Sequence, residues 1–242
     1  MNLKSITKTL MVAATMLALN VSAQNGQTSN FKFSSGDRNL ELQLVPLSLN
    51  NSPITLNGIK FRYFTSENAA LRLNVNLNSN SNTNITQMGV DSTDTPELKE
   101  KTSSFGFKLA PGYEMHFSGT NKLSPYVGGE LVIDYQTNSF REETETIDNK
   151  VVYTKTSNSS SGDNTPGYFG LSLNGIAGFD FYFTKSLYLG TELNYGLTLK
   201  SNLSTKIKSD QEGFTASDPQ KNGSSMSFAP MAVGQFKLGF LF

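Results

Sequence analysis

The sequence predicts an all-β fold, a closed antiparallel transmembrane β-barrel of about eight strands. Apolar and polar residues alternate along eight segments between residues 39 and 242, which is the pattern of strands with one apolar and one polar face. Several of these segments reach the ~9–11 residues that a tilted membrane strand needs, whereas soluble strands average ~5–6. Short connections alternate with long polar ones, as periplasmic turns and extracellular loops do in such barrels.

The first segment, residues 40–49, is the least regular, because its leucines change parity after Pro46, where we expect a β-bulge. In the next six segments most odd-numbered positions are apolar and most even-numbered positions are polar or small. The sixth is the clearest, since Phe, Leu and Ala dominate its odd positions. In the eighth the apolar positions are even-numbered. The second to eighth segments are 59–63, 71–77, 105–117, 127–135, 168–183, 187–199 and 228–242.

The predicted connections fall into two kinds. Residues 65–68, 118–123 and 184–186 form short turns, whereas 78–103, 136–165 and 200–224 are predicted to be long polar loops rich in Asn, Ser, Thr and Gly. An even number of strands would place both ends of the barrel on the periplasmic side.

The composition excludes several classes of function. The chain has 242 residues, enough for one domain, and its 20 Lys and Arg balance its 20 Asp and Glu, so nothing favours a nucleic-acid partner. Cysteine is absent, which excludes disulfides, thiolate chemistry, iron–sulfur clusters and a lipoprotein acyl anchor. The hydrophobic fraction is only 37%, which fits a barrel that places apolar residues at alternate positions.

The N-terminus predicts a secretory signal peptide. Lys4 and Lys8 precede an apolar stretch over residues 9–19, and residues 21–23 supply small side chains before a cleavage site. The alternative is a transmembrane anchor, but the apolar stretch is shorter than the ~20 residues that span a bilayer. We therefore divide the chain into a signal peptide, a polar leader and an outer-membrane barrel, at residues 1–23, 24–38 and 39–242.

The polar face is predicted to point into the barrel. It carries glycines and isolated charges, and a lumen enclosed by about eight strands is too narrow for the Phe and Leu of the other face. The predicted inward charges are Glu41, Lys60, Arg62, Arg72, Lys108, Glu114, Glu130, Asp134, Asp180, Glu192 and Lys237.

Strand order brings Glu192 near Lys237, and Glu41 faces Lys237 across the closing seam. Because unpaired buried charges are costly, we interpret the set as a structural network that plugs the lumen. The first alternative is that the charges line a narrow channel for small polar solutes. The second is a soluble exported lipocalin-like binder, with the apolar face inside.

Two hairpins and the C-terminal segment resemble the small outer-membrane β-barrel domain family, which is porin-like. They are residues 58–64 with 70–73, and residues 178–183 leading into 187–193. At the end of the chain Phe236, Leu238, Phe240 and Phe242 resemble the signal that the barrel-assembly machinery reads. The resemblance implies eight strands and residence in the envelope of a Gram-negative bacterium. It also implies roles from adhesion to envelope integrity to small-solute passage, with no catalytic motif.

No residue pattern predicts an enzyme, a cofactor or a metal site. His116 is the single histidine, and we interpret it as a lumen or rim residue. The alternative is a catalytic role with Ser or Asp, as in small barrels that act as lipid A acylases or deacylases. Lipid A lies in the outer leaflet, however, whereas His116 is predicted to lie near a periplasmic turn. The acidic run Arg141, Glu142, Glu143, Glu145 and Asp148 is interpreted as solvated, with a divalent or lipopolysaccharide-bridging cation as the alternative.

The expected partners are outer-membrane lipid, lipopolysaccharide and the barrel-assembly machinery; the sequence names no extracellular ligand.

Tyrosines near the ends of segments are expected to form an aromatic girdle at the membrane interfaces, because tryptophan is absent. They are Tyr113, Tyr126, Tyr135, Tyr168 and Tyr195.

Overall fold

The computed structural model describes residues 31–46, 54–87, 97–145, 150–159, 166–230 and 235–242. The predicted signal peptide and residues 24–30 of the leader lie outside them. The described residues form no helix, and none of them could provide a helical membrane span. Their strands are β1 (Arg38–Pro46), β2 (Ile54–Ser66), β3 (Ala69–Gln87), β4 (Glu97–His116), β5 (Leu123–Glu145), β6 (Val151–Ser157), β7 (Tyr168–Tyr182), β8 (Leu187–Asn202), β9 (Lys206–Ser209), β10 (Ser224–Pro230) and β11 (Gln235–Leu241).

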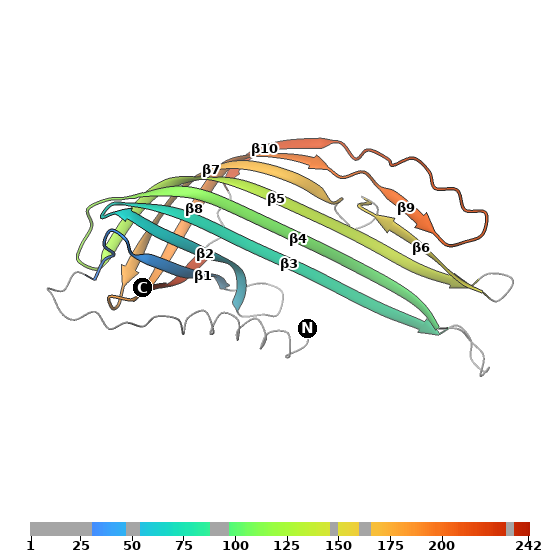
Figure 1. The fold of residues 1–242 in the computed structure, drawn as a ribbon, viewed down its shortest axis with the longest axis horizontal. Helices are drawn as coiled ribbons and strands as arrows, with labels where there is room; N and C mark the ends of the chain where they lie inside the picture. Colours follow the sequence, from blue (N-terminus) through green and yellow to red (C-terminus); the bar gives the residue numbers. More distant parts are fainter. Residues whose placement is uncertain (1–30, 47–53, 88–96, 146–149, 160–165, 231–234) are drawn as a thin grey trace.

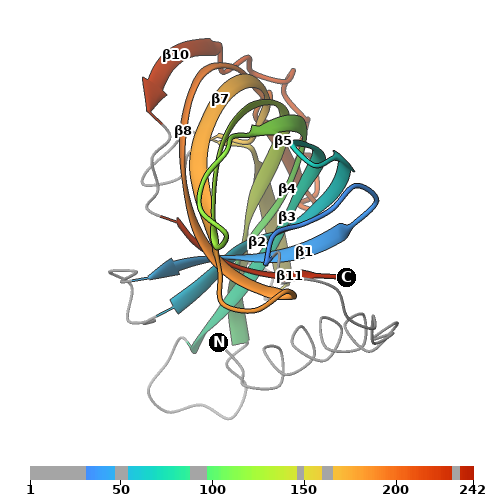
Figure 2. The ribbon, with the colours of Figure 1, turned by 90° about the vertical axis from the view of Figure 1, so that its left-hand side faces the viewer.

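Eight of the strands close into an antiparallel ring, in the order β1-β2-β3-β4-β5-β7-β8-β11 and back to β1 (Figure 2). The seam pairs β11 with β1, as the sequence predicted, and Phe240 lies opposite Leu40. Next to the seam, Arg38 and Phe242 exchange backbone hydrogen bonds of 2.9 and 2.8 Å. Closure leaves no free edge at this level of the ring.

Three strands of the ring run on beyond it as a protruding curved sheet, which β6 and β9 extend (Figure 1). The β3–β4 hairpin stays in register up to Gln87 opposite Glu97, and β5 continues to Glu145. The predicted loops at 78–103 and 136–165 are therefore wrong, since most of those residues are in strands. Asn, Ser and Thr occupy both faces of the extension, so the apolar–polar contrast that identifies a strand is missing there.

The first and last predicted strands differ from expectation in detail. The irregularity in β1–β2 pairing lies between Gln43 and Leu44, where Asn57 of β2 is the extra residue, so the bulge expected at Pro46 is wrong. The predicted eighth strand is divided into β10 and β11, which both pair with β8.

Side chains along the ring alternate between inside and outside. In β7 the burial alternates at nearly every residue, with Asn174 inside and Leu173 66% exposed outside. The neighbouring β8 places Glu192 inside and leaves Leu193 58% exposed. The ring thus has a polar interior and an apolar exterior, the reverse of a soluble barrel, and this excludes the lipocalin-like alternative.

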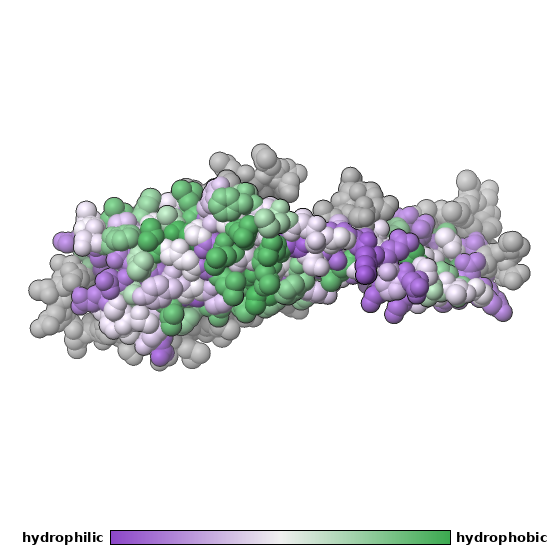
Figure 3. Space-filling view, turned by 90° about the horizontal axis from the view of Figure 1, so that it is seen from above, coloured by the Kyte–Doolittle hydropathy of each residue, from purple (hydrophilic) through white to green (hydrophobic). Residues whose placement is uncertain are grey.

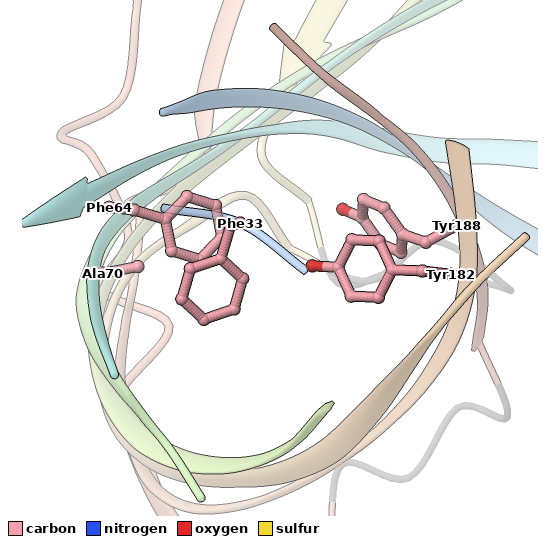
Figure 4. Packing of buried hydrophobic residues seen from close by; sticks show 5 residues of the cluster. All are labelled: Phe33, Phe64, Ala70, Tyr182 and Tyr188. Atoms are coloured by element: carbon pink, nitrogen blue, oxygen red, sulfur yellow. The ribbon is translucent and has the colours of Figure 1, made fainter. Parts of the chain in front are cut away.

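The buried apolar cluster is small and lies at the end of the ring near both the seam and the short turns (Figure 4). Its members are Phe33, Phe64, Ala70, Tyr182 and Tyr188. The aromatic ring of Phe33 stacks on that of Phe64, with 3.8 Å between centroids. The segment before β1 therefore enters this end of the ring, held by a hydrogen bond of 2.8 Å from Gly36 N to Phe64 O.

Candidate functional site: the charged interior of the ring

Arg62 of β2 is the centre of a buried ion-pair network inside the ring. Its guanidinium lies 2.8 Å from Asp180 Oδ2, 3.0 Å from Glu114 Oε2 and 3.2 Å from Glu41 Oε2. These carboxylates come from β7, β4 and β1, and none of the four side chains is exposed. The contacts with Asp180 and Glu114 cross the lumen to strands that do not pair with β2, whereas Glu41 lies on the neighbouring β1.

Arg72 of β3 forms a second centre one strand away. It lies 2.7 Å from Glu114 Oε1, 2.9 Å from Glu192 Oε1 and 3.2 Å from Glu130 Oε2. Glu114 therefore bridges Arg62 and Arg72, with one carboxylate oxygen for each. The charge-assisted hydrogen bonds between this carboxylate and the two guanidinium groups offset part of the cost of burying the three charges.

Two lysines complete the network on the seam side. Lys60 lies 2.9 Å from Glu41 and 3.0 Å from Glu192. Lys237 of β11 lies 3.2 Å from Asp180, and 3.6 and 3.8 Å from Glu192 and Glu41. The pairings of Lys237 with Glu192 and with Glu41, expected from strand order, are both present.

Two tyrosines hold the carboxylates in place. The Tyr188 hydroxyl donates to Glu41 at 2.7 Å, and the Tyr126 hydroxyl donates to Glu192 at 2.6 Å and also contacts Lys237. Gly239 on β11 gives Tyr188 its space, because a Cβ at that position would meet the tyrosine ring. Neither tyrosine was predicted to belong to the site, although both have the even, inward parity of Glu130 and Glu192.

The structure divides the predicted inward charges into two groups. Lys108 and Asp134 form a separate pair, 3.6 Å apart and partly exposed. The others join one continuous buried network, consisting of Glu41, Lys60, Arg62, Arg72, Glu114, Glu130, Asp180, Glu192 and Lys237.

A polar cavity of about 290 Å³ lies on one side of this network, where Glu130 forms part of its wall. In its wall, Tyr168 of β7 donates a hydrogen bond of 3.2 Å to Asp134 of the neighbouring β5. Most of its lining residues are polar or charged, and the lining consists of Gln43, Asn74, Asn76, Lys108, Ala110, Glu130, Val132, Asp134, Tyr168, Gly170, Ser172, Asn174, Asn194, Thr198 and Lys200. The interior thus changes from closed ion pairs to an accessible polar chamber.

His116 lies at the other side of the network, beside the aromatic cluster. Its Nδ1 is 3.0 Å from Ser124 Oγ and its Nε2 is 3.4 Å from Glu114. This order resembles a hydrolase triad, but Ser124 is 1% exposed and both oxygens of Glu114 face arginines. The ring of Phe33 packs edge-on against His116, so a substrate has no open path to the serine in this conformation.

The predicted aromatic girdle is wrong for two of its tyrosines. Tyr126 is 2% exposed inside the ring, and Tyr168 lines the polar cavity. Both have even numbers in segments whose apolar residues are odd, so parity would have placed them inside. Tyr113 and Tyr195 do point outward, at 45% and 47% exposure.

The acidic run does not form one cluster among the described residues. Glu142 lies on one face of β5, whereas Arg141, Glu143 and Glu145 lie on the other, because neighbouring strand residues alternate. Arg141 lies 3.2 Å from Glu143. Asp148 lies outside the described residues.

The residues proposed for assembly lie along β11. Leu238 pairs in register with Leu42 and Leu189, and Phe242 is 54% exposed next to the seam. The side chain of Phe236 lies outside the described part of the chain. Recognition of these residues by an assembly machinery stays a prediction.

A closed antiparallel ring with a charged interior and an apolar exterior defines a porin-like β-barrel protein. Residues 46–242 match the putative OmpA-OmpF-like porin family, and the chain belongs to that family. The chain is also similar to the crystal structure of Acinetobacter baumannii CarO2, at 14% identity over 86% of this chain and 96% of that one, with a TM-score of 0.35. No curated protein matches the sequence.

Proposed function

We propose that this protein is a non-enzymatic outer-membrane β-barrel of a Gram-negative cell envelope, with a structural or surface-interaction role. In this proposal a cleaved signal peptide exports the chain, the barrel-assembly machinery inserts it, and lipid and lipopolysaccharide surround it. The ring spans the bilayer, and the protruding sheet reaches outside the cell. The observation that carries the proposal is the reversed polarity of the ring, with arginines and carboxylates inside and leucines and phenylalanines outside.

The distribution of hydrophobic surface supports this placement. Figure 3 shows hydrophobic side chains gathered over the middle of the molecule and hydrophilic ones on the protruding end. In water, a wide band of exposed Leu and Phe would cause association, whereas in lipid the same band is stabilising. Closure of the ring also satisfies the backbone groups that a bilayer cannot solvate.

The sealed lumen supports a role that does not depend on transport. Arg62, Lys60 and Lys237 are 0% exposed, and their ion pairs connect strands from opposite sides of the ring. An ion crossing this level would have to separate charge pairs buried away from water, at a cost of several kcal/mol. The aromatic cluster that contains Phe33 also fills the lumen, at the end of the ring near the short turns.

A narrow channel for small polar solutes is the second candidate function, and the polar cavity favours it. A chamber of about 290 Å³ already leads to the network, so rearrangement of a few side chains would open a path. Planar-bilayer recording of the refolded protein distinguishes the two functions.

We expect no steady ohmic conductance from the unmodified protein, because the ion pairs close the lumen. The matched control is the same bilayer with a known open porin at the same protein concentration. Reproducible single-channel steps from the unmodified protein would contradict the sealed lumen and would make the narrow channel the favoured function.

A further inference from the structure

A row of basic residues crosses the outer face of the protruding sheet. Lys101 of β4 is directly opposite Arg141 of β5, Arg141 is opposite Lys155 of β6, and Lys155 is opposite Lys208 of β9. We call these residues the cation row. The three lysines are exposed, and Arg141 is partly exposed.

Such a row is electrostatically unfavourable by itself. Directly opposite residues of an antiparallel pair have Cβ atoms about 5 Å apart, and like charges at that spacing destabilise a sheet. The charge of Arg141 is compensated by Glu143, whose Oε1 lies 3.2 Å from the guanidinium. Within the described ranges, no acidic side chain forms an ion pair with Lys101, Lys155 or Lys208. An external anion would therefore stabilise the row.

The row lies on the same face as the apolar exterior of the ring. Phe105 of β4 is 44% exposed on that face. Lys101 lies four residues before Phe105 on the same strand, toward the protruding end, and has the same parity. At ~3.3 Å per residue and a tilt of ~40°, the row lies about 10 Å beyond the last phenylalanine. That distance places it beyond the hydrocarbon core, at the level of polar headgroups.

We propose that the cation row binds the phosphate groups of lipopolysaccharide in the outer leaflet. The inference rests on the proposed membrane placement, which fixes the height of the row above the bilayer. Several cations in one line match several phosphates on one lipid headgroup, and arginine adds a planar, bidentate contact. Bound lipid would thereby set the depth of the barrel and connect the protruding sheet to its surroundings.

The test is a titration of the refolded full chain, held in a zwitterionic detergent, with lipid A that carries both phosphates. The comparison ligands are dephosphorylated lipid A and inorganic phosphate alone. The variant is Lys155→Gln with Lys208→Gln. The matched control is Lys185→Gln with Lys221→Gln, which removes the same charge away from the row. Heat-modifiability gels verify that every variant forms the folded ring.

We expect phosphorylated lipid A to bind at least tenfold more tightly than the dephosphorylated lipid. The double variant should lose about tenfold to thirtyfold in affinity, since each basic residue near an anionic surface contributes about 1 kcal/mol. The control should bind like the unmodified chain, and rising salt should weaken binding.

Three results would overturn the proposal: equal affinity for the two lipids, equal loss in both variants, or binding of inorganic phosphate as tight as that of the lipid. The last would indicate a site for free anions instead of a lipid headgroup. Failure of the membrane placement itself would appear separately, as water contact of the ring exterior at Leu193.

Discussion

Replacing Arg62 with methionine is expected to lower the free energy of unfolding of the ring by about 3–5 kcal/mol. The substitution leaves Asp180, Glu114 and Glu41 without the guanidinium that lies 2.8–3.2 Å from each of them. Methionine keeps much of the apolar stem, so most of the loss comes from three buried carboxylates that each lose one of their cationic partners. Urea unfolding of the refolded protein in detergent, followed by the heat-modifiability gel, measures the change.

Arg38→Met is the matched control, because Arg38 begins β1 and its side chain is exposed. Its effect should stay within about 0.5 kcal/mol. If Arg62→Met proved as mild as Arg38→Met, the interior charges would be solvated, and the account of a closed network would be wrong.

Replacing Leu193 with arginine is expected to cost about 2–4 kcal/mol in a bilayer, the range for a basic residue at the lipid midplane of a barrel. Leu193 lies near the middle of β8 (Leu187–Asn202) and is 58% exposed. A charge there would lose its hydration without gaining a partner. Folding titrations into phosphatidylcholine vesicles measure the cost.

Ile85→Arg is a sharp control for this change. Ile85 is 56% exposed on the outer face of β3, so it matches Leu193 in exposure but belongs to the protruding sheet. We expect it to change stability by less than about 0.5 kcal/mol, because the proposed membrane placement leaves that sheet in water. Equal costs at the two positions would mean that lipid does not surround the ring.

Alternation predicted the ring because every ring strand separates two different environments. On β7, Asn174 points inside and Leu173 points outside, and the same contrast repeats on the neighbouring strands. The contrast ends where β3 passes beyond Leu77 and both faces are exposed. Asn, Ser and Thr suit a loop and a two-sided solvated strand equally well, so the protruding sheet could not be identified from the sequence.

The membership of the network was predicted more fully than its pairings. Strand order gives neighbours in the wall, such as Glu192 and Lys237, which lie 3.6 Å apart. The shorter contact of 2.8 Å joins Arg62 to Asp180 across the lumen, and it depends on how the ring is curved and flattened. Neither property can be calculated from residue alternation.

Phe33 and Tyr126 were missed for different reasons. Phe33 precedes the first strand, where no periodicity indicates which way a side chain points, so its position against Phe64 and His116 had no sequence signal. Tyr126 had a signal in its even number, but its closeness to a strand end favoured the girdle interpretation. Parity is the more reliable guide, because a slip of one residue would reverse every side chain of the strand.

The most direct measurement of the central claim is the environment of position 193. The chain has no cysteine, so Leu193→Cys accepts a single nitroxide spin label in the refolded, vesicle-bound protein, and Ile85→Cys provides the comparison. The account predicts that the label at 193 collides often with oxygen and seldom with a water-soluble nickel reagent, and that the label at 85 shows the opposite. A label at 193 that is open to the water-soluble reagent, or immobilised by packed protein, would contradict a ring whose apolar face is in lipid.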